Sequence, residues 1–115
     1  MIWTEPEYVP LFQAMAIESL HVYDNNMSTG DAVIAACPVS ITALKLYLTR
    51  LSRLPESMGQ LTALSILDLS SCVSLRMLPE SMGQLAALSS LNLRGCSSLA
   101  GLPESMGQLA ALTSL

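Results

Sequence analysis

The eight-residue string LPESMGQL occurs three times in this chain, beginning at Leu54, Leu78 and Leu102. Successive copies begin 24 residues apart. Internal repetition at such a period is typical of elongated proteins in which similar supersecondary units stack and each unit contacts only its neighbours. This feature constrains the fold more than any other, because every further structural position must then recur at the same interval.

The residues between the octets follow a second pattern in the same register, L-x-x-L-x-L-x-x-C-x-x-L. Its apolar positions are Leu64, Leu67, Leu69, Cys72, Leu75 and Leu78, and then Leu88, Leu91, Leu93, Cys96, Leu99 and Leu102. The pattern is similar to the signature of leucine-rich repeats, whose period is roughly 20 to 29 residues.

The first half of the chain fits the same template less regularly. One upstream repeat is formed by Ile41, Leu44, Leu46, Thr49, Leu51 and Leu54, and an earlier one by Ile17, Leu20, Val22, Asn25 and Met27. The repeats then start near residues 17, 41, 64, 88 and 112, with spacings of 23 or 24 residues. We therefore predict a leucine-rich-repeat array over residues 17–115, with four repeats and the opening of a fifth.

The spacing within one repeat predicts its local structure. In L-x-L, both leucines lie on one face of a short strand, and the Asn or Cys that follows faces inward and shields or satisfies backbone polar groups of the turn. The octet has Pro early, Glu in its first turn and Gly near its end, which predicts a short helix or 3-10 turn with Met58 and Leu61 facing inward. The predicted fold class is α/β: a right-handed solenoid with parallel strands on its concave face and short helices on its convex face.

Both ends of the array depart from this pattern. Residues 1–16 contain three of the five aromatic residues, Trp3, Tyr8 and Phe12. We predict that they form a hydrophobic lid over the first repeat or a degenerate half-repeat, with a partner-binding tail as the alternative. At the other end, Leu115 occupies a strand position of the repeat. We expect an uncapped strand edge there, which could pair with another copy of the chain and so lead to self-association. We also expect that the chain is a fragment of a longer array.

Charge is scarce in this chain, which argues against several classes of partner. Charged residues make up 12% of the sequence, against roughly 25% in ordinary globular chains. The basic residues are scattered, as Lys45, Arg50, Arg53, Arg76 and Arg94. We expect no nucleic-acid partner, because phosphate binding needs a basic stripe. We also expect no membrane partner, because the central uncharged stretch over residues 32–44 is too short to span a bilayer.

The cysteine count and the N-terminal composition predict a location. The chain has three cysteines, an odd number, and no C-x-x-C pair, which favours a reducing compartment. No basic region precedes an apolar run near the N-terminus, where Glu5 and Glu7 lie, so we expect no secretory signal. An intracellular, cytoplasmic protein is the prediction.

Residue patterns typical of catalysis or cofactor binding do not occur in the sequence. His21 has acidic neighbours in the chain, but the repeat register places it outward on a strand, so we expect an exposed histidine rather than a general base. The glycines form no G-x-G-x-x-G or Walker pattern. We expect Cys72 and Cys96 to be buried free thiols rather than a disulfide or metal pair. The sequence thus predicts no enzyme activity, no cofactor and no metal.

A different set of residues fits protein binding. The residue between the two strand leucines points outward, and in successive repeats it is His21, Lys45, Asp68 and Asn92. The next outward row contains Tyr23, Tyr47 and Arg94. Neighbouring strands lie about 4.8 Å apart, so Lys45 and Asp68 are close enough to pair. Tyrosine beside charge is typical of interfaces, and we predict that this face binds a partner. For Tyr23 and Tyr47, ordinary solvated strand residues stay an equal alternative.

The string LxxLxxLxLxxCxxLxxLPESMGQL resembles the leucine-rich repeats of plant and green-algal intracellular proteins, especially the C-terminal arrays of nucleotide-binding disease-resistance receptors. The resemblance covers residues 41–115 well and residues 17–27 more loosely. The resemblance implies a solenoid that senses ligands. No nucleotide-binding segment accompanies these repeats, so the resemblance implies a signalling role only for a parent protein that contains them.

We therefore predict a non-catalytic protein–protein interaction module that binds a partner through its concave face, in signalling or defence. One alternative is the substrate-recognition or regulatory arm of a larger enzyme, of ubiquitin ligase or kinase type, whose catalytic domain lies outside this chain. A further alternative is a fragment that self-associates through its uncapped C-terminal edge.

Overall fold

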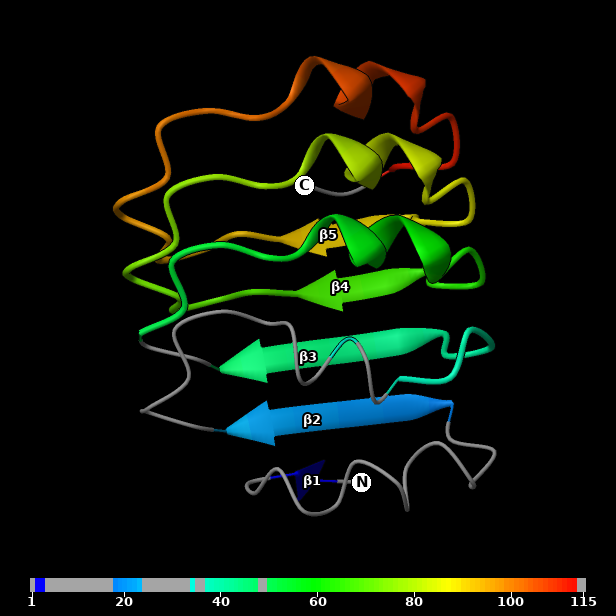
Figure 1. The fold of residues 1–115 in the computed structure, drawn as a ribbon, viewed down its shortest axis with the longest axis horizontal. Coiled ribbons are helices and arrows are strands. Elements are labelled where there is room, and N and C mark those ends of the chain that lie inside the picture. The colour runs from blue at the N-terminus through cyan, green and yellow to red at the C-terminus, as the bar shows by residue number, and fades with distance from the viewer. Residues whose placement is uncertain (1, 4–17, 24–33, 35–36, 48–49, 114–115) are drawn as a thin grey trace.

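The computed structural model of the chain describes residues 2–3, 18–23, 34, 37–47 and 50–113. In chain order, the strands are β1 (Ile2–Trp3), β2 (Ser19–Tyr23), β3 (Ala43–Tyr47), β4 (Ile66–Asp68) and β5 (Ser90–Asn92). The 3-10 helices are η2 (Glu56–Gln60), η3 (Glu80–Gln84) and η4 (Glu104–Gln108). All pairs of neighbouring strands are parallel, and the sheet order β1-β2-β3-β4-β5 follows the chain (Figure 1).

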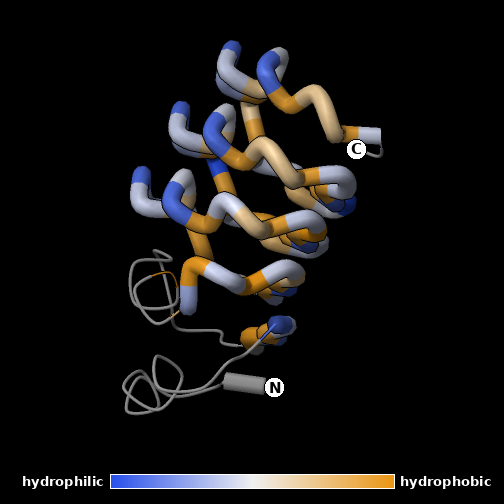
Figure 2. The backbone as a smooth tube through the Cα atoms, turned by 90° about the vertical axis from the view of Figure 1, so that its right-hand side faces the viewer, coloured by the Kyte–Doolittle hydropathy of each residue, from blue (hydrophilic) through white to orange (hydrophobic). Residues whose placement is uncertain are grey.

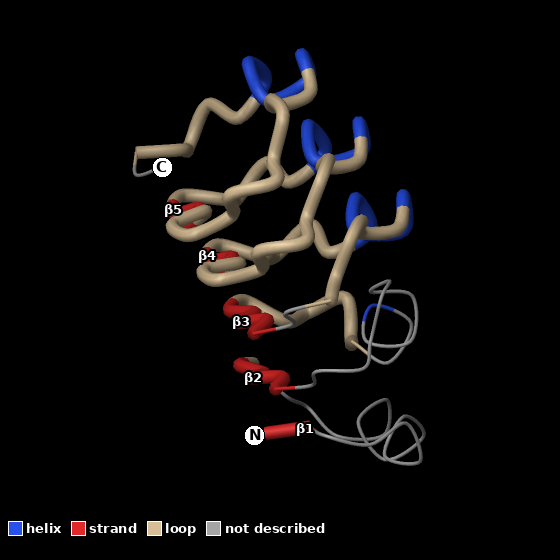
Figure 3. The backbone as a smooth tube through the Cα atoms, turned by 90° about the vertical axis from the view of Figure 1, so that its left-hand side faces the viewer, coloured by secondary structure: helices blue, strands red, loops and turns tan. Residues whose placement is uncertain are grey.

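The sheet lies on one side of the molecule and the 3-10 helices lie on the other (Figure 3). Parallel strands cannot be joined by a tight hairpin, so the chain crosses to the helix side after each of β3, β4 and β5 before it returns. The predicted α/β leucine-rich-repeat solenoid is confirmed. No helix in the described ranges is both long and apolar enough to cross a membrane.

Neighbouring strands pair at equivalent positions of the repeat. Leu20 pairs with Leu44, Leu44 with Leu67, and Leu67 with Leu91. Each of these four side chains is at most 1% exposed. Because side chains alternate between the two faces of a strand, this register directs the first leucine of every L-x-L segment into the core.

The core is a column of apolar side chains that runs through the stacked turns. Apolar segments recur at the same place in each turn (Figure 2). Met58 and Leu61, which the sequence predicts to face inward, are 0% and 2% exposed. Burial of one such side chain stabilises the fold by about 2 kcal/mol. Each layer of the column is covered by the next one, so the stability of a repeat depends on its neighbours.

Strand length differs between repeats for a local reason. Strands β2 and β3 have five residues, whereas β4 and β5 have three. The Asp68 Oδ1 at the end of β4 accepts a hydrogen bond from the Ser70 N–H (2.9 Å), and the Asn92 Oδ1 at the end of β5 accepts one from the Arg94 N–H (2.9 Å). These Asx turns bend the chain out of the strand direction. Lys45, at the equivalent place in β3, has no side-chain acceptor, and β3 continues.

A ladder of Ser and Thr hydroxyls joins successive repeats just before the strands. Each hydroxyl donates a hydrogen bond to the backbone carbonyl of the equivalent residue one repeat earlier. The pairs are Thr42 to Glu18 (3.1 Å), Ser65 to Thr42 (3.0 Å), Ser89 to Ser65 (3.1 Å) and Thr113 to Ser89 (3.2 Å). The ladder supplements the backbone hydrogen bonds between the same residues, and the leucine spacing gives no sign of it.

The inward cysteines connect neighbouring turns. The Cys72 thiol donates a hydrogen bond to the Leu46 carbonyl (3.3 Å), and the Cys96 thiol donates one to the Leu69 carbonyl (3.1 Å). Both cysteines are free; Cys72 is fully buried and Cys96 is half-buried. Both positions hold a free thiol that bonds to a backbone carbonyl, as predicted. The predicted burial is confirmed at Cys72 but not at Cys96, because no described strand stacks beyond β5.

The 3-10 helices pack closely because the octet contains a glycine. A Cβ atom added at Gly59 would lie 2.8 Å from the Ser81 Cβ, and one added at Gly83 would lie 2.6 Å from the Ser105 Cβ. Both distances are too short for real carbon atoms, so any larger residue would push the repeats apart. The Glu56 Oε2 also accepts a hydrogen bond from the Ser81 N–H (3.2 Å), which links η2 to the start of η3.

Several sequence-based predictions fall outside the described residues. They concern the aromatic residues Tyr8 and Phe12, the turn positions Asn25 and Thr49, and the strand position of Leu115. Of residues 1–16, the structure describes Ile2–Trp3, which pair with β2 as β1. The sequence analysis did not predict this pairing. A separate N-terminal lid over residues 1–16 stays a prediction.

Candidate protein-binding surface

The outward side chains of the strands form the surface that the sequence predicts for partner binding. In its middle row, His21, Lys45, Asp68 and Asn92 occupy paired positions from β2 to β5. His21, Lys45 and Asp68 are half-buried, and Asn92 is exposed. The sheet register therefore brings these four residues into one continuous row.

The charges in the middle row do not neutralise one another. Lys45 and Asp68 occupy paired positions, but their side chains form no ion pair in the described part of the chain. The Asp68 Oδ1 instead accepts a hydrogen bond from the Ser70 N–H (2.9 Å), two residues further along the chain. Among the described residues, no carboxylate pairs with the Lys45 ammonium group.

The second predicted row is shorter than expected. Tyr23 and Tyr47 occupy paired positions at the ends of β2 and β3. Tyr47 is half-buried, and the side chain of Tyr23 lies outside the description. Arg94 is exposed but follows the end of β5, because the Asx turn at Asn92 ends that strand. The structure thus pairs the backbone positions of the two tyrosines and puts Arg94 in the turn after β5.

A third outward row, which the sequence analysis omitted, lies at the starts of the strands. Its members are Ser19, Ala43, Ile66 and Ser90. Ile66 is 41% exposed and is a large aliphatic residue on this surface. Alternation along a strand puts the residue before the first leucine on the same side as the residue after it. The row was therefore visible in the sequence one residue upstream of each L-x-L segment.

We define the strand face as these outward residues of β2 to β5. It contains the mixed charges of the middle row, the aliphatic Ile66 and the half-buried Tyr47. Apolar and aromatic side chains beside charged ones are the composition of many protein interfaces. The chemistry of this face suits recognition of another protein.

The titratable and nucleophilic side chains of the described residues are dispersed. Over the described ranges, no three His, Cys, Asp or Glu side chains are placed to hold a metal ion. Burial raises the pKa of the Cys37 thiol to about 12. Burial also raises the pKa of Cys96; the negative charge of Asp68 adds to the rise, and a hydrogen bond with the Cys72 backbone opposes it. Both thiols are protonated at neutral pH, and the protonated form is a weak nucleophile.

Comparison with known proteins agrees with this architecture. The chain is similar to a solved structure of the leucine-rich repeat domain of the type III effector XopL, with a TM-score of 0.75 and 27% sequence identity over 93% of this chain. It spans 36% of the length of that chain. No protein-family model and no curated protein matches the sequence. The chain is a leucine-rich repeat protein by fold, and such repeats typically form non-catalytic interaction surfaces.

Proposed function

We propose that the strand face binds a partner protein, and that the chain serves as a recognition module in an intracellular signalling or defence process. The observation that carries the proposal is the set of paired outward positions across β2 to β5, in which Lys45, without an ion pair among the described residues, lies one strand away from the exposed Ile66. The signalling or defence setting rests on the resemblance of the repeat string to the arrays of plant receptors.

The dimensions of the strand face suit a folded partner. Four strands separated by about 4.8 Å span about 14 Å between the first and the last. In the register of β3 with β4, Ile66 pairs with Ala43 and Lys45 pairs with Asp68, so the aliphatic side chain of Ile66 and the ammonium group of Lys45 belong to adjacent strands. A partner surface with an apolar side chain near a carboxylate would complement this arrangement.

The test is a pull-down with the chain immobilised, from an extract of the cells that express it. Lys45→Glu and Ile66→Asp are expected to weaken capture of the partner by about tenfold, because truncating or reversing central interface residues typically costs more than 1 kcal/mol. Tyr47→Ala is expected to act in the same direction. Arg50→Glu is the matched control, because Arg50 is exposed and lies outside the strand face.

Circular dichroism and thermal unfolding of each variant separate lost binding from lost folding. The proposal predicts that the strand-face variants fold like the native chain and lose the partner. Unchanged capture by Lys45→Glu and Ile66→Asp would contradict it, and so would equal loss of capture in the Arg50→Glu control.

A second candidate function is the recognition arm of a larger enzyme, of ubiquitin ligase or kinase type. The observation that favours it is that the similar solved structure is described as one domain of an effector, and this chain spans 36% of the length of that chain. The full open reading frame tests it. A catalytic domain encoded in the same frame would support this candidate, and a frame with leucine-rich repeats alone would contradict it.

A further inference from the structure

The turns that follow the strands contain most of the basic residues of the chain. We define the turn edge as the described residues that leave the carboxyl ends of β3, β4 and β5, at the left of Figure 1: residues 50–53, 69–77 and 93–101. Four of the five basic residues of the chain belong to this edge: Arg50, Arg53, Arg76 and Arg94. The fold therefore gathers on one edge the basic residues that are scattered in the sequence.

Contacts between neighbouring turns make this edge continuous. Arg53 and Met77 form an isolated parallel bridge, which joins the turn after β3 to the turn after β4. The Ser71 N–H donates a hydrogen bond to the Arg94 carbonyl (2.7 Å), which joins the turn after β4 to the turn after β5. The arginines thus belong to one surface that crosses three repeats.

The charge of the turn edge has a single sign. Its residues include no Asp or Glu. The adjoining carboxylate is that of Asp68, the last residue of β4, and its Oδ1 accepts a hydrogen bond from the Ser70 N–H. All four arginines are exposed, and none of them forms an ion pair within the described ranges. The edge therefore presents guanidinium groups that no described carboxylate neutralises.

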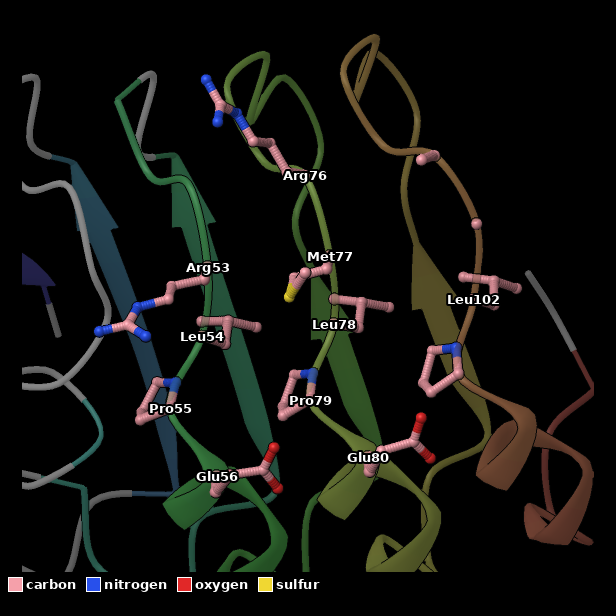
Figure 4. A pocket seen from close by; sticks show the side chains of 13 residues that line it. Arg53, Leu54, Pro55, Glu56, Arg76, Met77, Leu78, Pro79, Glu80 and Leu102 are labelled. Atoms are coloured by element: carbon pink, nitrogen blue, oxygen red, sulfur yellow. The ribbon is translucent and has the colours of Figure 1, made fainter.

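The helix side of the solenoid has the opposite charge. Each 3-10 helix begins with a glutamate and contains no basic residue; the glutamates are Glu56, Glu80 and Glu104. The side chains of Arg53 and Arg76 extend away from the carboxylates of Glu56 and Glu80, which point toward the following repeat (Figure 4). The described array is thus electrically polar, with cations on the turn edge and anions on the helices.

Two apolar side chains project from the turn edge among the arginines. Val73 is 44% exposed and Met77 is 62% exposed. Apart from these two and the arginines, every exposed residue of the edge is Ser, Ala or Gly. The long side chains of arginine and methionine, together with Val73, therefore reach furthest from the backbone, and they make the first contact with anything that approaches this edge.

We propose that the turn edge binds the surface of a membrane that contains anionic phospholipids. The guanidinium groups bind headgroup phosphates, for which the planar fork of arginine is suited. Val73 and Met77 enter the boundary between the headgroups and the acyl chains. The carboxylates of the helix side are repelled by the same surface, so the electrical polarity of the array orients the turn edge toward the lipid.

The combination of cations and projecting apolar side chains favours lipid over other anionic partners. A folded protein with an acidic patch would match the arginines, but it would also have to offer a pocket for each of Val73 and Met77. Nucleic acid presents phosphates, yet the turn edge includes no aromatic residue on which bases could stack. A lipid surface supplies both the phosphates and a soft apolar layer. The expectation of no membrane partner rests on the absence of a spanning segment, and binding at the surface needs none.

The test is sedimentation of the chain with lipid vesicles. Vesicles of phosphatidylcholine alone are compared with vesicles that also contain phosphatidylserine. We expect the native chain to sediment with the anionic vesicles and to stay in solution with the neutral ones. Binding is expected to be lost at a salt concentration of about 1 M, where the Debye length falls to about 3 Å.

Removal of the projecting side chains is expected to weaken binding in steps. One basic residue near an anionic surface raises binding by about fivefold. Arg76→Gln is therefore expected to lower the vesicle-bound fraction relative to the free one by about fivefold, and Arg50→Gln, Arg76→Gln and Arg94→Gln combined by about a hundredfold. Met77→Ser is expected to weaken binding by about fivefold, whereas Met77→Leu is expected to retain it.

The matched control makes the same change in net charge on the helix side. Gln60, Gln84 and Gln108 are exposed, and each is the last residue of a 3-10 helix. Their combined replacement by Glu lowers the net charge by as much as the triple arginine variant does. This control is expected to bind anionic vesicles like the native chain. Circular dichroism of every variant verifies that it is folded.

Three outcomes would overturn the proposal. The first is equal sedimentation with the two kinds of vesicle. The second is equal loss of binding in the triple arginine variant and in the glutamine control, because net charge alone would then explain it. The third is binding of a poly-glutamate peptide or a DNA duplex that depends on the same arginines, without binding of the anionic vesicles.

Two single variants separate the turn edge from the strand face. Arg76→Gln is expected to lose the vesicles and to keep the protein partner of the strand face. Lys45→Glu is expected to lose that partner and to keep the vesicles, and loss of vesicle binding in this variant would contradict a lipid site on the turn edge. Failure of the vesicle experiments leaves the pull-down result for the strand face unaffected.

Discussion

The three copies of LPESMGQL have one sequence and two kinds of surroundings. Helices η2 and η3 each have a following 3-10 helix packed against them, whereas no described residue stacks on the far side of η4. Met58 and Met82 have no exposed surface, and Met106, at the same position of the third copy, is only partly buried. Burial in this fold is therefore set by the neighbouring repeat, since the residues within the copy are the same.

The glycines of the three copies show the same difference. At Gly59 and Gly83, an added Cβ atom would collide with the next repeat, and at Gly107 it would meet no atom within 4 Å. One residue type thus has two energetic roles. In the first two copies glycine permits close packing of the helices. In the third copy no described residue lies close enough to Gly107 to require a glycine there.

The largest expected effect comes from removing a methionine in the two surroundings. Met82→Ala is expected to lower the free energy of unfolding by about 2 to 5 kcal/mol, because it leaves a cavity in a fully buried layer. Met106→Ala is expected to lower the free energy of unfolding by only about 1 kcal/mol, since Met106 is partly buried and less contact is lost. Urea unfolding followed by circular dichroism measures both. Equal losses in the two variants would show that the neighbouring repeat does not control burial.

An intermediate effect is expected from adding a methyl group at the glycines. Gly83→Ala is expected to lower the free energy of unfolding by about 1 to 3 kcal/mol, because the new Cβ would collide with backbone and side-chain atoms of Ser105. Gly107→Ala is expected to leave stability unchanged or to raise it by about 0.5 kcal/mol, since alanine reduces the entropy of the unfolded chain. Thermal unfolding of the two variants gives the comparison, and a destabilised Gly107→Ala chain would contradict it.

The smallest effect compares equivalent turn positions in two consecutive repeats. Ser71 has φ of 65° and Gly95 has φ of 81°, both in the left-handed region that favours glycine. Gly95→Ser is expected to lower the free energy of unfolding by about 1 kcal/mol, and Ser71→Gly is expected to raise it by about 0.5 kcal/mol. The midpoint of urea unfolding measures both changes. A stabilising Gly95→Ser substitution would contradict the shared turn geometry.

Most of the fold was predictable because the repeat period is a local property of the sequence. The L-x-L segments specify strands and their inward face, and the octet specifies the short helix opposite them. The predicted roles of Met58 and Cys72 are confirmed. The pairing of Ile2–Trp3 with β2 was not predicted, because a two-residue strand carries no periodic pattern and its place depends on the sheet it joins.

The candidate binding surface was predictable in part for the same reason. Alternation and spacing together predict the middle row, which the sheet register brings together from His21 to Asn92. Lys45 and Asp68 lie at paired positions, as predicted, but they form no ion pair within the described residues, and the Asp68 carboxylate accepts a hydrogen bond from the Ser70 N–H instead. Neither the hydrogen bond from the Ser70 N–H to Asp68 nor the exposure of Ile66 follows from the repeat spacing.

The sequence by itself determined the period, the inward leucine column and the residues that face outward, since each depends on spacing along a single repeat. Tertiary structure decided everything that joins one repeat to the next. The hydroxyl ladder and the hydrogen bond from the Ser81 N–H to Glu56 both join residues about one repeat apart. Their geometry depends on how closely the turns stack, and that distance is set by glycine contacts and core packing rather than by any local pattern.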